Sequence, residues 1–345
     1  MNKPQFGVLI IFNTQDSNSM RNAIHIILNL FFLMKKSIIF SLVFLSAILS
    51  VCCSKSEDAP SVEVATNQDK FNIVFSLNFN KDNTGAYNIE QWKIDWNFPT
   101  WANKKYGYGT IVQESTNKYL MQTFVPGAWL AAEGYQWHGK FSQGYNELYL
   151  SYRVKFSSAF SSRDLHGKLP GLSGGASNGG GDLPTGEDGW SARYMFHGTL
   201  INFYLYHPDI YKDAGDSQPV AGKSYYGYGP ELYPGFILKT DTWYTVTQRV
   251  VMNTPGKTDG LVEGFVNGKL CAVQTGIRFR DIATLQIDRI YFANFFGGSG
   301  VTPTENGSIS FDDFVVYTYN TSVNVARNNV ANPAGTTILL PNLPQ

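Results

Sequence analysis

The chain has 345 residues, with 27 Lys and Arg balanced by 27 Asp and Glu. This zero net charge argues against a nucleic-acid-binding protein, which needs a basic excess to neutralise phosphates. Only 16% of the residues are charged, 15% are aromatic and 33 are Gly, which favours β-strands over helices. The length allows two domains, but all-β sandwiches of this size often form a single one.

The N-terminal region has the order of features found in a bacterial lipoprotein signal. A basic pair is followed by the apolar run Ser37–Val51 and then by Cys52 and Cys53. The run has signal-peptide length and is too short to span a bilayer comfortably. A valine stands before the first cysteine, where a small residue is usual, so the choice of acylated cysteine stays open, as does a plain secretory signal. We expect translation to start at Met34 and residues 1–53 to hold this signal and an N-terminal extension.

This signal predicts secretion across the inner membrane and a lipid anchor, at the outer membrane or cell surface of a Gram-negative bacterium. Residues 54–69 are polar and without periodicity, as in a flexible tether. Residues 70–320 contain many strand-length segments, several alternating at period two, with Gly, Pro, Asn and Asp between them. No segment shows a convincing helical period, and residues 321–345 form an Asn- and Pro-rich tail. We therefore expect one all-β domain, an antiparallel β-jelly-roll sandwich of the concanavalin A-like type.

A glycine-rich stretch begins at His166 and carries Lys168 near its start. A phosphate-binding P-loop places its lysine after the glycines, between a strand and a helix. Here the lysine precedes the glycines and no helix is expected to follow. Nucleotide binding is therefore disfavoured, and we expect a loop.

Other common chemistries lack their residue patterns. The sequence contains no G-x-S-x-G motif, no H-x-x-x-H motif and no cluster of aspartates, which disfavours a serine hydrolase and a metal enzyme. No strand carries alternating carboxylates, as a jelly-roll glycosidase would need. Asp312 and Asp313 are adjacent in one strand, so their carboxylates are expected on opposite faces, which suits a structural role or a structural calcium ion.

Strand alternation places several polar side chains together. In the segment GWSARYMF, Ser191 and Arg193 share one face; in LINFYLYH, Asn202, Tyr204 and Tyr206 share one face opposite an apolar one. A sandwich strand needs one dry face and can leave the other wet. These polar side chains can therefore line one open sheet face.

With Lys168 on the preceding loop, this face offers two cations and two phenols but no carboxylate. β-Elimination from a 4-linked uronic acid requires such a set. The proton on C5 becomes acidic only when the adjacent carboxylate is neutralised, and a base and an acid must then serve C5 and the leaving oxygen on C4. Tyrosines near Arg and Lys can fill both roles, and the reaction needs no metal or organic cofactor.

The motifs GKLPGLSGG, GWSARYMF and NFYLYH resemble the core motifs of polysaccharide lyase family 14, over roughly Asn146–Tyr319. The resemblance implies a jelly-roll lyase that acts on an acidic polysaccharide, alginate first. Family 20 glucuronan lyases share much of the pattern, so a glucuronan lyase stays an alternative, as does a non-catalytic carbohydrate-binding jelly roll. The family's site residues fall on Lys168, Ser191, Arg193, Tyr204 and Tyr206.

On these grounds we expect Lys168 and Arg193 to neutralise the uronate carboxylate and the two tyrosines to transfer protons. Ser191 would orient substrate or base, and Lys168 as the base is an alternative that requires a strongly lowered pKa. Five further residues are candidates for sugar contact. His166 and His207 flank this set, Arg153 and Asn202 lie on polar strand faces, and Trp137 is a candidate for a further subsite.

Overall fold

The computed structural model describes residues 71–319, with gaps at 105–106, 129–133, 161–164, 231, 233–237, 298–301 and 304. The predicted signal and tether (1–69), with Cys52 and Cys53, and the predicted tail (321–345) lie outside the described residues. No helix in the described part of the chain is long and apolar enough to cross a membrane.

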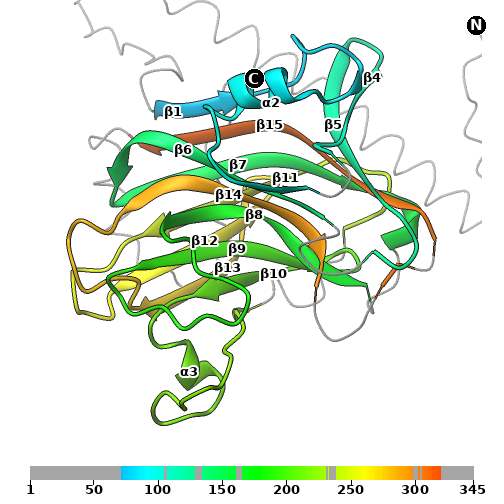
Figure 1. Ribbon diagram of the computed structural model, residues 1–345. Helices are drawn as coiled ribbons and strands as arrows, with labels where there is room; N and C mark the ends of the chain where they lie inside the picture. The colour runs from blue at the N-terminus through cyan, green and yellow to red at the C-terminus, as the bar shows by residue number, and fades with distance from the viewer. Residues whose placement is uncertain are drawn as a thin grey trace, which may run out of the picture. The chain divides into compact units, whose positions relative to one another are not determined.

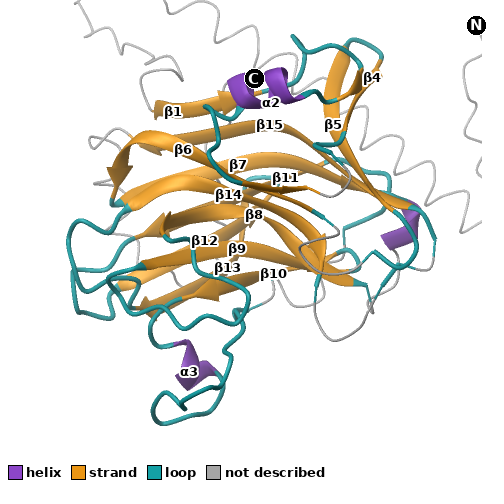
Figure 2. Cartoon of the chain, in the orientation of Figure 1, coloured by secondary structure: helices purple, strands orange, loops and turns teal. Residues whose placement is uncertain are grey.

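Alternating, β-branched and aromatic segments pair into two antiparallel sheets, which hold nearly all of the regular structure described (Figure 1, Figure 2). The six-stranded sheet has the order β10 (Leu200–Tyr206), β9 (Gly189–His197), β8 (His166–Gly175), β14 (Ile287–Phe296), β6 (Tyr135–Tyr145) and β3 (Ala102–Lys104). The nine-stranded sheet has the order β13 (Lys269–Ile277), β12 (Gly260–Val266), β11 (Tyr244–Val251), β7 (Glu147–Phe156), β15 (Gly307–Tyr319), β5 (Asn117–Phe124), β4 (Thr110–Glu114) and β2 (Gly85–Ala86), with β1 (Phe71–Leu77) also paired to β15. The predicted jelly-roll sandwich is confirmed.

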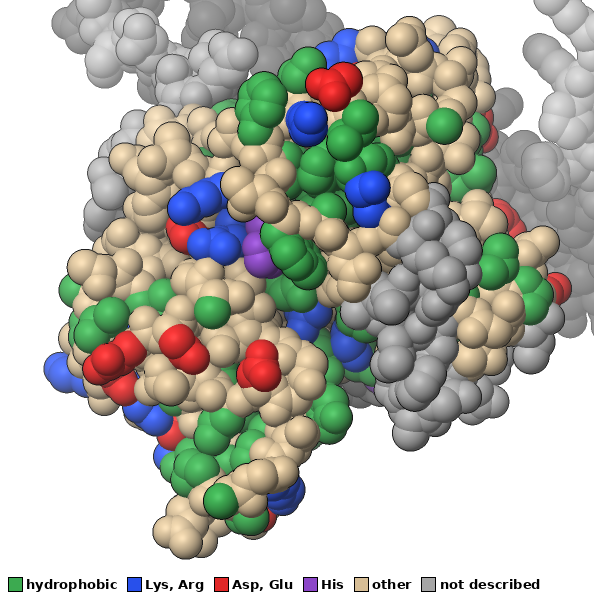
Figure 3. All heavy atoms as spheres, in the orientation of Figure 1, with side chains coloured by type: hydrophobic (Ala, Val, Ile, Leu, Met, Phe, Trp, Pro, Cys, Tyr) green, Lys and Arg blue, Asp and Glu red, His purple; other side chains and the backbone are tan. Residues whose placement is uncertain are grey.

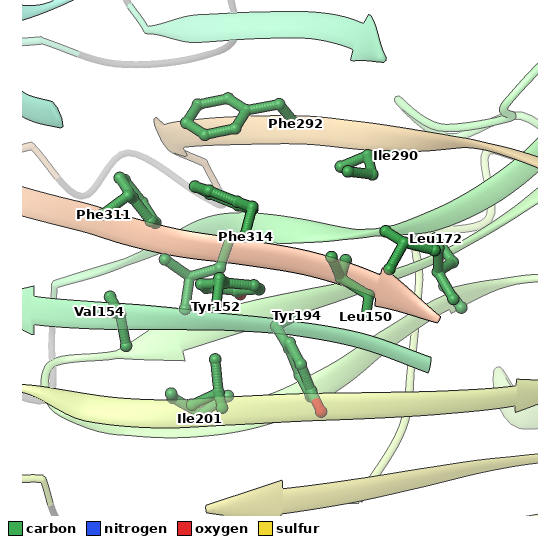
Figure 4. Packing of buried hydrophobic residues seen from close by; sticks show 14 of the residues in the cluster. Leu150, Tyr152, Val154, Leu172, Tyr194, Ile201, Ile290, Phe292, Phe311 and Phe314 are labelled. Atoms are coloured by element: carbon green, nitrogen blue, oxygen red, sulfur yellow. The ribbon is translucent and has the colours of Figure 1, made fainter. Parts of the chain in front are cut away.

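The core lies between the two sheets and is dense in aromatic rings. Figure 4 shows Phe311 and Phe314 of β15 directed toward Phe292 of β14, and the Phe292 and Phe311 rings are 5.3 Å apart in an edge-to-face contact. Trp137 of β6 is completely buried here, with its ring stacked 4.1 Å from that of Phe292. The prediction of Trp137 as a sugar contact is therefore wrong, because the strand turns this side chain into the core.

Short helices occur, although the sequence pattern predicts none. They are α2 (Ile89–Asp95), the 3-10 turn η3 (Ser158–Phe160) and α3 (Ile210–Asp213). Helix α2 begins where the Asn88 side chain accepts hydrogen bonds from the first backbone N–H groups, a standard N-cap. Trp92 and Trp96 then lie one turn apart and both are buried. Both rings pack in the core, and the helix of seven residues is too short to give a periodicity signal.

The first part of the glycine-rich stretch, with Lys168, is the strand β8 rather than the expected loop, whereas residues 176–188 form a loop as predicted. β8 lies in the middle of its sheet, between β9 and β14. A Cβ atom on Gly171 would clash with the backbone of Ala192 on β9, and one on Gly174 with the backbone of Gln286. These two glycines are thus explained by the close approach of neighbouring backbone.

The prediction that Asp312 and Asp313 point to opposite faces is also wrong. The pairing of β15 with β7 shifts register just after Asp312, and Asp313 has a left-handed φ of 49°. This bulge brings both carboxylates toward Arg153, at 3.8 Å and 3.2 Å from its Nη1 atom. Within the described residues, no cluster of three or more His, Cys, Asp or Glu side chains is arranged to hold a metal ion.

Candidate active site

The outer face of the six-stranded sheet carries the polar side chains that alternation places together. Ser191 and Arg193 of β9 share this face with Tyr204 and Tyr206 of β10, and Lys168 of β8 adjoins them. Register places Arg193 directly opposite Tyr204, and Ser191 opposite Tyr206. In the space-filling view, Lys and Arg side chains lie in a hollow near the middle of one face of the molecule (Figure 3).

Lys168 is only 5% exposed, and none of its contacts with the described residues is with a carboxylate. Its Nζ atom lies 3.2 Å from the Met195 sulfur and 3.7 Å from the centre of the Tyr204 ring. Both are weak partners for an ammonium group. Burial, with a smaller contribution from the charge of Arg193, lowers the pKa of Lys168 well below its ordinary value. Neutral Lys168 is therefore accessible at far lower pH than for a surface lysine.

Arg193 is the charged group at the centre of the site, and it is 2% exposed. Its guanidinium lies 4.4 Å from the centre of the Tyr291 ring and 5.3 Å from that of Tyr204. Its Nε atom is buried and has no hydrogen-bond partner in the described residues. A buried donor without a partner is costly unless a ligand supplies an acceptor, so this group is suited to bind an anion.

The hydroxyls of Tyr204 and Tyr206 are 3.2 Å apart, within hydrogen-bond distance. Burial, and after it the neighbouring Tyr206, raises the pKa of Tyr204 above its ordinary value. Tyr204 therefore keeps its proton at neutral pH and can donate it. The Tyr206 hydroxyl also accepts a hydrogen bond from the backbone N–H of Gly181, at 3.2 Å.

Ser191 is completely buried, and its hydroxyl donates to the backbone carbonyl of Asn178 at 2.6 Å. Asn178 belongs to the loop that joins β8 to β9. The hydroxyl thus fastens this loop to the sheet. Its position favours a positioning role over direct contact with a substrate.

The sequence model of polysaccharide lyase 14 matches residues 113–314, more than half of the chain. The chain belongs to polysaccharide lyase family 14. It is accordingly a polysaccharide lyase. No curated protein matches it.

Solved structures agree with the family. The alginate lyase Aly36B is 26% identical, with a TM-score of 0.57 over 70% of this chain and 95% of that one. A variant of Aly36B in complex with an alginate tetrasaccharide is 25% identical, with a TM-score of 0.58 and coverage of 70% and 95%. The alginate lyase from Aplysia kurodai is 21% identical, with a TM-score of 0.55 and coverage of 71% and 98%, and shows the shared fold.

Two loops of the lyase cover one end of this face, so it is less open than the sequence predicts. The loop after β8 and the loop after β10 are joined by a hydrogen bond from Tyr225 N–H to the Gly181 carbonyl, at 3.0 Å. Arg278 fixes the second loop by a two-bond ion pair with Asp209. These contacts explain why Tyr206 is completely buried although it faces away from the core.

Three of the further candidates for sugar contact, Asn202, His166 and His207, lie near the site face but have other partners in the lyase. Asn202 lies on the same face of β10 as the tyrosines, but its amide donates to the backbone carbonyl of Phe203. His166 packs against the His197 ring at 5.4 Å, at the start of β8. His207 follows β10, and its Nε2 atom lies 3.2 Å from Asp213. Within the described residues, the side-chain contacts of Lys168 and Arg193 are with Met195, Tyr204, Tyr206 and Tyr291, and with none of these three.

Arg153 belongs to the other sheet of the lyase, so its prediction as a sugar contact at this site is wrong. It lies on β7, paired with β11 and β15, and its guanidinium is held by Asp313 and by the face of Trp243 at 4.7 Å. Alternation identified its polar strand face correctly. It gave no information on which sheet the strand joins.

The sequence reasoning missed four residues on the site face of the lyase. Tyr291 of β14 lies under Arg193, and its hydroxyl donates to Gln136 at 3.1 Å. Met195 contacts Lys168. His138 packs edge-to-face on Tyr291, and Trp101 packs on His138, each at 4.8 Å. Alternation within YQWHGKF would have found His138, since it takes the face opposite Trp137.

Proposed function

We propose that this lyase cleaves alginate by β-elimination at the cluster of Lys168, Arg193, Tyr204 and Tyr206. The proposal rests on one observation above all. A buried amine, a buried guanidinium and two linked phenols converge on one sheet face, without a carboxylate among the contacts described for them. The alginate tetrasaccharide bound by the Aly36B variant, a structure of the same fold, supports a polyuronate as substrate.

In this mechanism Arg193 binds the carboxylate of the uronate. Its buried, unpartnered Nε atom gains an acceptor, and the positive charge stabilises the enolate-like anion formed when C5 loses its proton. The anion collapses to a C4–C5 double bond, the C4–oxygen bond breaks, and the departing oxygen takes up a proton. The cluster therefore needs one base and one acid near the same bond.

The structure favours a different division of these roles from the one the sequence predicts. Tyr204 has a raised pKa and is a poor base, whereas Lys168 has a lowered pKa and is available as a neutral amine. We infer that Lys168 accepts the C5 proton and that Tyr204 donates a proton to the leaving oxygen. Lys168 lies against the Tyr204 ring and can then return its proton toward the phenolate. Tyr206, hydrogen bonded to Tyr204, holds the acid in place.

The substrate is tested by incubating the described domain with alginate, polymannuronate, polyguluronate and glucuronan. We expect the ultraviolet absorbance of the conjugated uronate product to rise with alginate. If the absorbance rises with glucuronan and not with alginate, the substrate is glucuronan instead. Binding of alginate without any product would show a carbohydrate-binding protein instead of an enzyme.

We also propose that the lyase is anchored at the bacterial surface through lipid on Cys52 or Cys53. The support is the signal pattern in the sequence, and a surface enzyme can reach a polymer too large to enter the cell. The full chain should partition into the detergent phase, and a double Cys52→Ser, Cys53→Ser variant should not. Equal partitioning of both proteins would refute the anchor.

A further inference from the structure

A row of side chains crosses the six-stranded sheet at right angles to its strands. It begins with Tyr204 and Arg193, which are register partners on β10 and β9. Arg193 then reaches over β8 to Tyr291 of β14, at 4.4 Å. The crossing is open because Gly171, the register partner of Tyr291 on β8, has no side chain. The row therefore leads out of the catalytic cluster and across the sheet.

Beyond Tyr291 the row continues to the opposite side of the sheet. His138 of β6 is the register partner of Tyr291, and the two rings are 4.8 Å apart. Trp101 precedes β3, next to the pair formed by Ala102 and Trp137, and its ring lies 4.8 Å from that of His138 at an angle of 31°. From β9 to β6 the row spans three strand spacings, about 14 Å. One sugar ring cannot bridge that distance.

Trp101 is held in place rather than loosely attached. The segment between α2 and β3 is tied to β6 by a hydrogen bond of 2.8 Å, which the Asn97 side chain donates to the backbone carbonyl of Lys140. Yet Trp101 stays 40% exposed, whereas four of the other five described tryptophans (Trp92, Trp96, Trp137 and Trp190) are buried. An exposed, fixed, flat ring in line with a catalytic cluster is a platform on which a sugar ring can stack.

Two polar side chains on the face of β6 that Trp101 contacts through His138 make no polar interaction with the described residues. The Nε2 atom of His138 is buried without a hydrogen-bond partner in the described residues. Lys140, two residues further along the same strand face, is exposed, and its ammonium makes no ion pair with the described part of the chain. The two side chains start about 7 Å apart along β6. By contrast, neighbouring Arg289 is occupied by a two-bond ion pair with Asp288.

The charge state of these groups suits an acidic sugar. Burial, followed by the charges of Arg289 and Arg193, lowers the pKa of His138 to about 4. The imidazole is then neutral at neutral pH and can hydrogen bond to a sugar hydroxyl, while the exposed Lys140 side chain can pair with a carboxylate. In Figure 3 a histidine lies at the rim of the hollow, beside a hydrophobic side chain and near Lys and Arg.

We propose that Trp101, His138 and Lys140 form a distal subsite, which binds a uronate residue of the polymer remote from the bond that is cleaved. The proposal rests on the proposed function. It adds the path of the bound polysaccharide, which would cross the strands of the sheet from β10 to β3. Binding at this distance anchors a polymer more strongly than a short oligosaccharide.

The subsite is tested by polymer binding in a chain that does not cleave its ligand. We take Lys168→Met as the background and measure alginate affinity by calorimetry. Adding Trp101→Ala should raise Kd about tenfold, as for loss of an aromatic anchor. Adding Lys140→Ala should raise it about threefold, and Lys140→Arg should restore most of the affinity because the charge returns.

Trp243→Ala and Lys257→Ala are the matched controls, since Trp243 contacts residues of the other sheet and Lys257 lies in an exposed turn. Melting temperatures of all variants must agree with the background. Unchanged Kd for both the Trp101 and Lys140 variants would overturn the subsite, as would an equal loss in the Trp243 control. Absence of product from the unmodified lyase would overturn the proposed function alone, because binding is read without turnover.

Discussion

Replacing Lys168 by Met is expected to abolish most activity while making the protein more stable. If Lys168 is the base, turnover on alginate should fall about 10²-fold or more. The buried amine has only a thioether and a ring face as partners, so Met of similar length should fill its space at lower cost. We expect the free energy of unfolding at neutral pH to rise by about 1–2 kcal/mol, measured by urea denaturation.

The pH dependence of both quantities checks this interpretation. The folded pKa of Lys168 lies well below the ordinary value of 10.5. Between the two values the unfolded chain binds more protons, so the stability of the unmodified protein should rise with pH in that window, and Lys168→Met should lose this rise. The ratio kcat/KM should also rise with pH through the lowered pKa, because the neutral amine is the active form. A fall over the same range would show that the ammonium form acts, and Lys168 would then be a carboxylate ligand.

Replacing Tyr204 by Phe is expected to have the second large effect. The ring that covers Lys168 stays, but the proton donor is gone, so kcat should fall about 10²–10⁴-fold with little change in KM. The free energy of unfolding should fall by only about 0.5–1.5 kcal/mol, because the substitution removes the hydrogen bond between the Tyr204 and Tyr206 hydroxyls and leaves the ring in place. Steady-state kinetics on alginate and thermal unfolding measure both.

Tyr206→Phe is the matched control for this experiment. It removes the hydroxyl that links Tyr204 to Gly181, so it should lower kcat through the position of Tyr204 and leave the pH profile of Lys168 in place. A larger loss in Tyr206→Phe than in Tyr204→Phe would reverse the assignment and make Tyr206 the acid.

The site could be predicted from the sequence wherever strand alternation decides the outcome. Ser191, Arg193, Tyr204 and Tyr206 share a face because successive side chains of a strand alternate, and neighbouring strands in a hairpin pair directly. The prediction of Trp137 as a sugar contact does not follow this rule. Its strand buries Tyr135, Trp137 and Phe141 and turns Gln136, His138 and Lys140 to the other face.

The remaining errors arise from pairing, which a single sequence does not contain. Arg153 has the correct polar face but lies in the other sheet. The carboxylates of Asp312 and Asp313 converge because a bulge breaks the alternation between them. The burial of Ser191 and Tyr206 depends on two loops that meet through Tyr225 and Gly181, far apart in sequence. Alternation describes one strand at a time and cannot supply these contacts.

The mass of the products released from alginate tests the central claim most directly. β-Elimination leaves a double bond at the new non-reducing end, so each such fragment should be lighter by one water molecule than the product of hydrolysis. We predict that the lyase releases these unsaturated fragments and that Lys168→Met and Tyr204→Phe release almost none. Saturated fragments alone from the unmodified protein, or unsaturated fragments at full rate from both variants, would contradict the mechanism proposed for this site.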